Sequence, residues 1–265
     1  MTPAQRSTDL EKQIEVLEKR FRDSAEELKD LRLKLVQTTQ DELDEIKDEW
    51  EGVHYKWWII TLAGVLGFFM LSYSLYTHLG WAADHRAMPS GSDWLLRHLP
   101  YLNVLPVLSW GWLGLHVFAG AAAILYYPRR IPFLVFLLGL FIGIRSVFIF
   151  LSPIGPPVGM LDMSKLDSLF APILGTWTFQ NEFVFSGHTS IPFLFFLFFE
   201  TPRLKAIMLA GSLTMGVCVL LSHEHYSVDV LGAYFVSYSI FVLAEKLYYG
   251  WIRPLFQVKP SRARY

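Results

Sequence analysis

The sequence predicts an all-α membrane protein, a bundle of six transmembrane helices preceded by an amphipathic helix. Hydrophobic residues make up 53% of its 265 residues and aromatic residues 16%, more than an ordinary soluble domain contains. Charged residues concentrate near the amino terminus, and long uncharged runs follow. The net charge of −1 provides no basic surplus, so we expect no nucleic-acid partner.

The first segment, residues 1–52, has the 3,4 spacing of a heptad repeat. Positions 10, 14, 17, 21, 24, 28, 31, 35 and 38 hold Leu, Ile, Leu, Phe, Ser, Leu, Leu, Leu and Thr. Thr8 and Glu11 have capping-box spacing just before this repeat. The pattern fits a coiled coil that makes a homo-oligomer, and it equally fits an amphipathic helix lying on the membrane or on its own protein. The segment is too acidic for a cleaved signal peptide.

Residues 53–252 are expected to form the six-span membrane domain. The first run, residues 57–77, has no charge, and a helix of that length covers about 30 Å, the thickness of a bilayer core. The other expected spans are residues 99–128, 131–151, 183–199, 206–222 and 230–244. Residues 253–265 form a basic tail.

Basic residues predict the orientation of the bundle. With a cytoplasmic amino terminus, eight basic residues after the first span fall on the inner side and three on the outer side, which satisfies the positive-inside rule. The inner group is Arg129, Arg130, Arg203, Lys205, Arg253, Lys259, Arg262 and Arg264, and the outer group is Arg86, Arg97 and Lys165. We therefore expect both termini in the cytoplasm.

Two polar motifs lie at the outer ends of expected spans. FSGHTS, residues 185–190, opens the fourth span, and SHEHYSVD, residues 222–229, precedes the sixth. Because two spans separate them, His188 and His225 reach the same membrane face. Asp229 follows His225 by four residues, so the two share one helix face. Each group alone fits an interfacial hydrogen bond, but together they indicate a functional site.

These residue types suit phosphoester chemistry. One histidine attacks phosphorus while the other protonates the leaving oxygen, and Asp229 fixes the tautomer of His225. Ser186 and Gly187 place free backbone N–H groups at a helix start, which attracts phosphate. The single cysteine, Cys218, excludes an intramolecular disulfide and a cysteine-based zinc site. We expect no metal and no cofactor.

The two motifs closely resemble those of the sphingomyelin synthase family, a branch of the lipid phosphate phosphatase superfamily, whose members are type 2 phosphatidic acid phosphatase-like. That family carries SGHT and H-Y-T-x-D-V-x-x-x-Y. This chain has SGHT at residues 186–189 and HYSVDVLGAY at residues 225–234, with Ser227 in place of threonine. The resemblance covers roughly residues 85–250.

A second part of the resemblance precedes SGHT. The family has a double arginine, a further arginine and a threonine seven residues later, and the corresponding residues here are Arg129, Arg130, Arg145 and Ser152. Arg145 lies three residues farther from the pair than the family pattern has it. The family's cysteine-glycine-aspartate is replaced by QNE, residues 180–182.

The resemblance implies a phosphodiester exchange that moves a phospho-headgroup from a glycerophospholipid donor to a lipid acceptor, ceramide or diacylglycerol. It implies that His225 is the nucleophile, that Asp229 orients it, and that His188 protonates the departing diacylglycerol oxygen. Arg145 would neutralise the phosphate, and Thr189 completes the SGHT motif beside the substrate.

Two carboxylates are candidates for binding the headgroup of the substrate. Glu182 and Glu224 flank the two motifs, and carboxylates and aromatic faces attract the cation of choline or ethanolamine. Tyr226, Phe183 and Phe185 could supply aromatic faces, although each also fits an interfacial position.

Three other functions stay open. A lipid phosphate phosphatase would use the same histidines, but that group usually carries K-x6-R-P and an arginine where Val219 stands here. An inositol-phosphoceramide synthase-like enzyme is a closer alternative, and a catalytically silent coiled-coil scaffold is the non-enzymatic one. The sequence shows no SAM-type module or sorting motif, which fits a bacterial inner-membrane enzyme or a compact eukaryotic one. We expect the bacterial one, with its active site on the periplasmic, extracellular or lumenal side.

Overall fold

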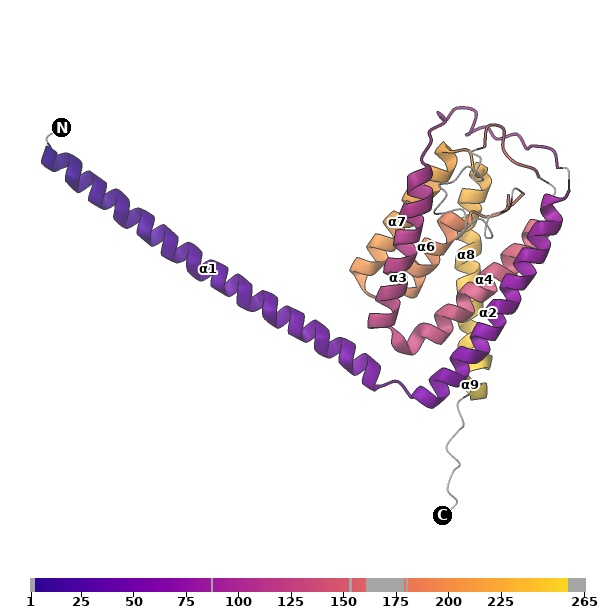
Figure 1. The fold of residues 1–265 in the computed structure, drawn as a ribbon, viewed down its shortest axis with the longest axis horizontal. Coiled ribbons are helices and arrows are strands. Elements are labelled where there is room, and N and C mark those ends of the chain that lie inside the picture. The colour runs from indigo at the N-terminus through magenta and orange to yellow at the C-terminus, as the bar shows by residue number, and fades with distance from the viewer. Residues whose placement is uncertain (1–2, 87, 153, 161–178, 180, 257–265) are drawn as a thin grey trace, which may run out of the picture. The chain divides into compact units, whose positions relative to one another are not determined.

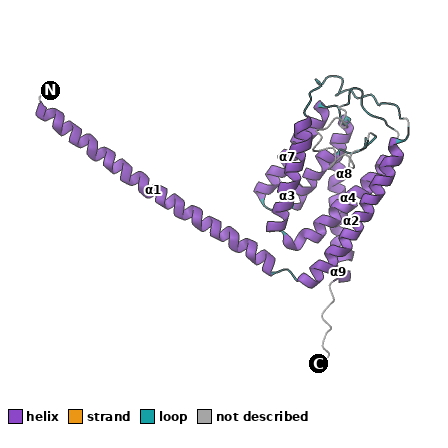
Figure 2. Cartoon of the chain, viewed as in Figure 1, coloured by secondary structure: helices purple, strands orange, loops and turns teal. Residues whose placement is uncertain are grey.

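The computed structural model describes residues 3–86, 88–152, 154–160, 179 and 181–256. The chain divides into two compact units, Met1–Gly52 and Val53–Tyr265. The first contains one helix, α1 (Pro3–Glu51), and the second contains a helical bundle (Figures 1 and 2). The described residues form no β-strand, and the all-α prediction is confirmed.

Helix α1 presents its apolar positions to solvent within a single chain. Leu28, Leu31 and Leu35 of the heptad pattern are exposed, as is Phe21. Three further heptad positions, 10, 14 and 17, lie outside the described side chains. A helix in water without tertiary packing is only marginally stable, so burying these apolar heptad positions against another helix would stabilise α1. Oligomerisation through a coiled coil stays a prediction.

The bundle consists of helices joined by short turns or by longer loops. Its elements are α2 (Tyr55–Asp84), the π-helical turn η1 (Val107–Gly111), α3 (Trp112–Tyr126), the 3₁₀ turn η2 (Pro128–Arg130), α4 (Ile131–Leu151), α6 (Gly187–Phe198), α7 (Pro202–Leu221), α8 (Ser227–Leu247), the π-helical turn η4 (Tyr248–Ile252) and α9 (Arg253–Phe256).

Five segments of the bundle are long and apolar enough to cross a membrane, and α6 is shorter. The five are Tyr55–Asp84, Val107–Tyr126, Pro128–Leu151, Pro202–Leu221 and Ser227–Leu255. With 12 residues, α6 covers only about 18 Å. The expected six spans are therefore five long helices and one short one, and the expected start of the fourth at residue 183 is corrected to Gly187. The chain before Gly187 is not helical because Ser186 is the N-cap, with φ −56° and ψ 121°.

Aromatic packing holds the bundle together. Phe133 of α4, Phe198 of α6 and Tyr248 of η4 are buried together. The ring centroids of Phe198 and Tyr248 lie 6.3 and 5.5 Å from that of Phe133. Helix α2 packs along α4, where Gly139 permits close approach, because an added Cβ there would lie 3.2 Å from the Cα of Phe69. In a bilayer such van der Waals fit, rather than escape from water, drives helix association.

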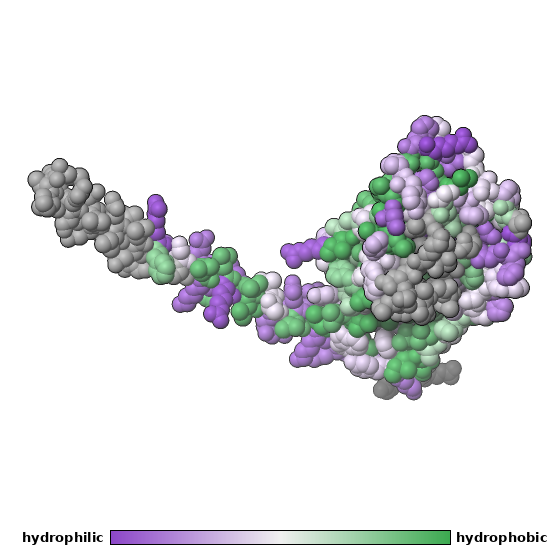
Figure 3. All heavy atoms as spheres, turned by 45° about the horizontal axis from the view of Figure 1, so that its top comes forward, coloured by the Kyte–Doolittle hydropathy of each residue, from purple (hydrophilic) through white to green (hydrophobic). Residues whose placement is uncertain are grey.

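The outer surface of the bundle is apolar. Large hydrophobic side chains such as Met70 and Leu71 on α2 and Leu231 and Phe235 on α8 are exposed. Figure 3 shows hydrophobic residues on the flanks of the bundle. A soluble monomer rarely exposes so much apolar area, whereas lipid chains require it. The chain is an integral membrane protein.

The described parts of the connections from α2 to η1, from α4 to α6 and from α7 to α8 gather at one end of the bundle (Figure 1). Backbone contacts tie them together, including the N–H of Leu102 donating to Leu221 O at 2.8 Å and a bridge between Ser90 and Gly155. Helices α6 and α8 both begin at this end. The two polar motifs of the sequence therefore lie at the same end of the bundle.

Candidate active site

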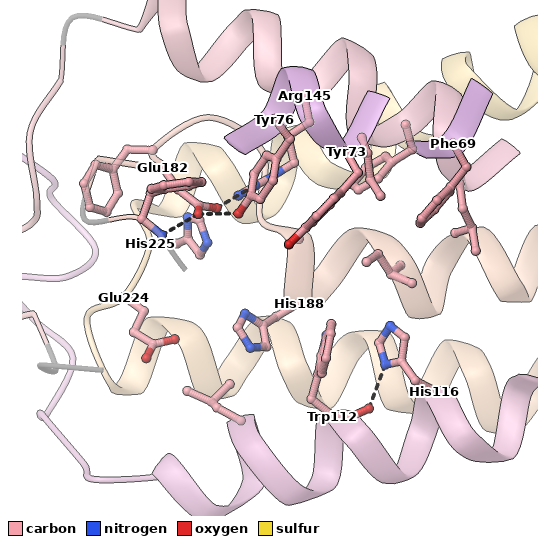
Figure 4. A pocket seen from close by; sticks show the side chains of 18 of the residues that line it. Phe69, Tyr73, Tyr76, Trp112, His116, Arg145, Glu182, His188, Glu224 and His225 are labelled. Carbon is pink, nitrogen blue, oxygen red and sulfur yellow. Dashed lines mark hydrogen bonds and ion pairs between the residues drawn. The ribbon is translucent and has the colours of Figure 1, made fainter. Parts of the chain in front are cut away.

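A cavity of about 360 Å³ lies inside the bundle, with residues of α2 and α4 on one side and of α3 on the opposite side (Figure 4). The acidic, basic and histidine side chains among the described lining residues are His116, Arg145, Glu182, His188, Glu224 and His225. Aromatic and aliphatic side chains line the rest, among them Phe69, Tyr73, Leu138, Phe141 and Ile191. Figure 4 shows His188, Glu224 and His225 around one end of this space and Phe69 at the other.

His225 and Asp229 form a pair at the start of α8. The Nδ1 of His225 lies 3.3 Å from Oδ2 of Asp229, and both side chains are buried. The same oxygen accepts the backbone N–H of Tyr226 at 3.1 Å, which caps the helix. A carboxylate at this position places the Nδ1 proton toward itself, so Nε2 carries the free lone pair. The predicted pairing of these residues is present in the structure.

His188 is the second residue of α6, two residues after the N-cap Ser186. The hydroxyl of Ser186 accepts the N–H of Thr189 at 3.4 Å, and the N–H of Ser186 donates to the carbonyl oxygen of Asp229 at 3.1 Å. This second bond joins the two motifs through their backbones. The ring of Trp112 packs 5.6 Å from that of His188. The two histidines are therefore held on one cavity by elements far apart in the sequence.

Arg145 enters the cavity from α4 and is paired. Its Nη1 donates to Oε2 of Glu182 at 2.6 Å, and its Nε donates to the carbonyl oxygen of Phe185 at 3.2 Å. The other oxygen of Glu182 accepts from Tyr76 Oη and from the N–H of Phe179, each at 2.6 Å. A Cβ added to Gly187 would lie 3.8 Å from Arg145 Cζ, so the guanidinium lies beside the start of α6.

Glu182 therefore has a structural partner as well as a place on the cavity wall. From the sequence, we expected Glu182 to attract a headgroup cation and Arg145 to neutralise the charge of the phosphate. In the structure the two carry an ion pair with both side chains nearly buried. The charge of Arg145 is therefore compensated by the carboxylate of Glu182.

Glu224 is presented to the cavity by the turn that ends α7. The N–H groups of His223 and Glu224 donate to the carbonyl oxygens of Leu220 and Val219, at 3.1 and 2.9 Å, a Schellman arrangement. His223 has φ 55°, the left-handed conformation that glycine usually supplies. Glu224 is 7% exposed, its Oε1 has no hydrogen-bond partner among the described residues, and burial raises its pKa to about 8.

Three predicted substrate contacts, Ser186, Thr189 and Tyr226, are not among the described residues that line the cavity. The hydroxyl of Tyr226 donates to Gly155 O at 2.8 Å and accepts the N–H of Gly91 at 2.7 Å, so it connects two loops. Thr189 is fully buried against α7, where a Cβ added to Gly216 would lie 3.5 Å from its hydroxyl. Phe183 lines the cavity, whereas Phe185 packs against Phe141 with ring centroids 5.7 Å apart.

Asp93 supports the site through a contact with the start of α8 that the sequence did not predict. Its Oδ2 accepts the N–H of Ser227 at 2.6 Å, and its Oδ1 accepts those of Leu95 and Leu96. Burial tends to raise the pKa of Asp93, but these hydrogen bonds to the carboxylate outweigh it and lower the pKa. The sequence does mark Asp93 as unusual, because it is the one acidic residue between positions 85 and 106.

Fold and site together define a polytopic helical membrane protein with two histidines, a supporting aspartate and a buried arginine at an internal cavity. The family model described as "PAP2 superfamily C-terminal" matches residues 181–246, which contain both histidine motifs. A 71-residue segment is 35% identical to Phosphatidylcholine:ceramide cholinephosphotransferase 2 of Rattus norvegicus and, equally, of Mus musculus.

The similarity is confined to part of each protein. The matched segment covers 24% of this chain, and the chain spans about a fifth of the length of those curated relatives. The matches confirm, for this part of the chain, the predicted resemblance to PAP2-superfamily proteins and to ceramide cholinephosphotransferases.

Proposed function

We propose that the protein is a lipid phosphotransferase that moves a phospho-headgroup from a glycerophospholipid to a lipid alcohol such as ceramide. One observation carries this proposal: His188 and His225, from separate segments, line one cavity beside Arg145, and Asp229 supports His225. The apolar remainder of the cavity suits the lipid parts of the two substrates. The names of the matched relatives refer to phosphatidylcholine and ceramide.

The first half of the reaction forms a phosphohistidine. Nε2 of His225 attacks phosphorus, the bond from phosphorus to the diacylglycerol oxygen breaks, and His188 gives that oxygen a proton. Asp229 keeps the proton of His225 on Nδ1 and stabilises the positive charge that the ring develops. The second half reverses these roles. His188 takes the proton of the acceptor hydroxyl as its oxygen attacks phosphorus, and the bond to His225 breaks.

The charges around the cavity favour a phosphodiester substrate. A diester carries one negative charge and a phosphomonoester up to two, so a monoester needs more positive charge around it. Arg145 is already paired with Glu182, and Val219, where lipid phosphate phosphatases usually have an arginine, is fully buried in the core. A lipid phosphate phosphatase is the second candidate, because the same histidines would serve it.

Product analysis tests the proposal. The purified protein is incubated with headgroup-labelled phosphatidylcholine, phosphatidylethanolamine or phosphatidylinositol, with and without ceramide, and in parallel with labelled phosphatidic acid. Transfer of label to ceramide supports a phosphotransferase. Free phosphate from phosphatidic acid as the sole product would establish the phosphatase instead, and no turnover of any substrate by folded protein would favour a scaffold. His188→Ala is the inactive control.

A further inference from the structure

His116 is a histidine of the cavity wall that the proposed chemistry does not use. It lies on α3, one turn after Trp112, and Figure 4 shows its ring directed from that helix into the cavity. Its Nδ1 lies 2.7 Å from the carbonyl oxygen of Trp112, whereas its Nε2 is buried without a hydrogen-bond partner among the described residues. A buried polar atom without a partner costs free energy, so this nitrogen has an unmet demand that a ligand can satisfy.

The contact with Trp112 determines what Nε2 can do. A carbonyl oxygen only accepts hydrogen bonds, so Nδ1 carries the proton and donates it. The imidazole lies between aromatic rings, with the centroid of Trp112 at 3.8 Å and that of Phe195 at 6.3 Å. A second proton would place a positive charge in these apolar surroundings at a high cost. His116 is therefore neutral, and its Nε2 is a hydrogen-bond acceptor.

Trp112 contributes the opposite kind of group. Its indole Nε1 is a donor, and it is also buried without a partner among the described residues. Trp112 and His116 line the same cavity one helical turn apart. One unpaired donor and one unpaired acceptor complement a secondary amide, which has a carbonyl oxygen and an N–H.

The pair lies next to the reacting centre. The ring of Trp112 packs between the two histidines, 5.6 Å from that of His188 and 3.8 Å from that of His116, and Figure 4 shows the three rings in this order. In the proposed reaction His188 takes the proton of the acceptor hydroxyl, which places that hydroxyl beside His188. An acceptor lipid that continues along this wall brings its next polar group to Trp112 and His116.

The two candidate acceptor lipids differ at this point. Ceramide has an amide on the carbon atom next to the one that carries the reacting hydroxyl, and diacylglycerol has an ester there. An ester can accept from Trp112 Nε1, but it has no hydrogen for Nε2 of His116 and leaves that nitrogen unpaired. A site with a buried polar group discriminates strongly against an analogue that cannot pair with it.

We propose that Trp112 and His116 bind the amide group of the acceptor lipid, with Nε2 of His116 accepting the amide N–H and Nε1 of Trp112 donating to the amide carbonyl oxygen. The inference rests on the proposed function and specifies its acceptor class, an N-acylated amino alcohol rather than a diacylglycerol. His116 acts by binding and transfers no proton. Its hydrogen bond to the carbonyl oxygen of Trp112 keeps the accepting nitrogen free for the ligand.

The first test compares acceptors in wild-type protein and in His116→Phe, which keeps an aromatic ring beside Trp112 and removes both nitrogens. With phosphatidylcholine as donor, kcat/KM is measured for ceramide and for labelled diacylglycerol. We expect the ratio of the two values to fall about ten-fold, the effect of one hydrogen bond, through a higher KM for ceramide. The matched control is His78→Phe, because His78 makes the same kind of bond to Ser74 O, at 2.7 Å, on an exposed surface. Equal loss for both acceptors, or an unchanged ratio, would overturn the inference.

Ceramide analogues test the same bond in the unmodified protein. N-Methylceramide lacks the amide hydrogen, and 3-deoxyceramide keeps it but lacks the secondary hydroxyl. We expect N-methylation to lower kcat/KM about ten-fold in wild type and to have little further effect in His116→Phe, because the same hydrogen bond is missing in both. A loss with 3-deoxyceramide alone would mean that the amide is not the group recognised.

A binding measurement separates this inference from the proposed function. The thermal midpoint of the His225→Ala protein is recorded with short-chain ceramide and with short-chain diacylglycerol. A larger stabilisation by ceramide, abolished when His116→Phe is added, supports the amide site even if no transfer activity is found. Equal stabilisation by the two lipids would refute it while leaving phosphotransfer intact.

Discussion

His225 precedes the N-cap of α8 and lies four residues before Asp229, and this aspartate also caps the helix that carries it. We expect His225→Ala to lower kcat by about three orders of magnitude or more, because the nucleophile is lost. Asp229→Ala should cause a comparable loss because the imidazole ring of His225 would lose the hydrogen bond that orients it. The double variant should have a kcat scarcely lower than that of His225→Ala. Transfer assays on the three variants check this, with the exposed, loop-borne His98→Ala as control. Losses that simply add would mean that the two residues act independently.

The buried Glu224 also predicts a pH dependence of stability. Its pKa is about 8 in the folded protein and close to 4.5 when unfolded, so the folded state binds the proton more tightly. This contribution is fully present below about pH 4.5 and is lost as pH rises through about 8, by up to about 1.4 kcal/mol per pH unit. Glutamine imitates the protonated acid at every pH.

We therefore expect the thermal midpoint of Glu224→Gln to rise relative to wild type as pH increases from 5 to 8.5. The titratable groups that share the cavity, Tyr73, Tyr76, His116, Arg145, Glu182, His188 and His225, are common to both proteins. Thermal unfolding in detergent measures the difference, and Glu200→Gln should show no such trend because its side chain is exposed. A constant difference across this range would contradict a raised pKa.

At the scale of elements, the turn from α7 to α8 places Glu224 and His225. This turn depends on a left-handed residue, His223, and a non-glycine residue there costs about 1 to 2 kcal/mol. We expect His223→Gly to retain the fold and to match or exceed wild-type stability. His223→Val should lower stability by more than 1 kcal/mol, because a β-branched side chain tolerates positive φ poorly. Thermal or denaturant unfolding of both variants measures these changes in stability. A His223→Val protein as stable as wild type would contradict the left-handed conformation at this position.

For the whole molecule, the two compact units predict independence of the bundle from its amino-terminal helix. Removing residues 1–52 should change the oligomeric state and leave most of the activity, because every described lining residue of the cavity belongs to the second unit. Light scattering in detergent and the transfer assay measure the two effects. Loss of turnover by a well-folded truncated protein would show that α1 contributes to the reaction.

The side of the membrane on which the cavity end lies is a second prediction at this scale. Because basic residues favour cytoplasmic termini, the loop end of the bundle should face outward. In a Cys218→Ser background, Val158→Cys should react with a membrane-impermeant thiol reagent in intact cells, whereas Arg203→Cys should react after permeabilisation only. Both wild-type side chains are exposed. The reverse labelling pattern would place the reaction on the cytoplasmic side.

The sequence by itself determined the helical membrane fold, because a backbone in lipid must satisfy its hydrogen bonds internally and hydropathy therefore reports helices directly. It also determined the pairing of His225 with Asp229, since that contact is local to one turn of helix. The exact start of the fourth span was not determined in this way: the sequence placed it at residue 183, whereas the N-cap Ser186 makes the helix begin at Gly187.

Tertiary structure alone decided what distant side chains do. Arg145 meets Glu182 across 37 residues, and Asp93 holds the N–H of Ser227 across 134, contacts that no local pattern encodes. Tyr226 and Thr189 belong to the motifs but face loops and α7, because the rotation of a helix about its axis determines which side chains reach a cavity. That rotation is set by packing against neighbouring helices, so the ligand-facing set could be read only from the folded bundle.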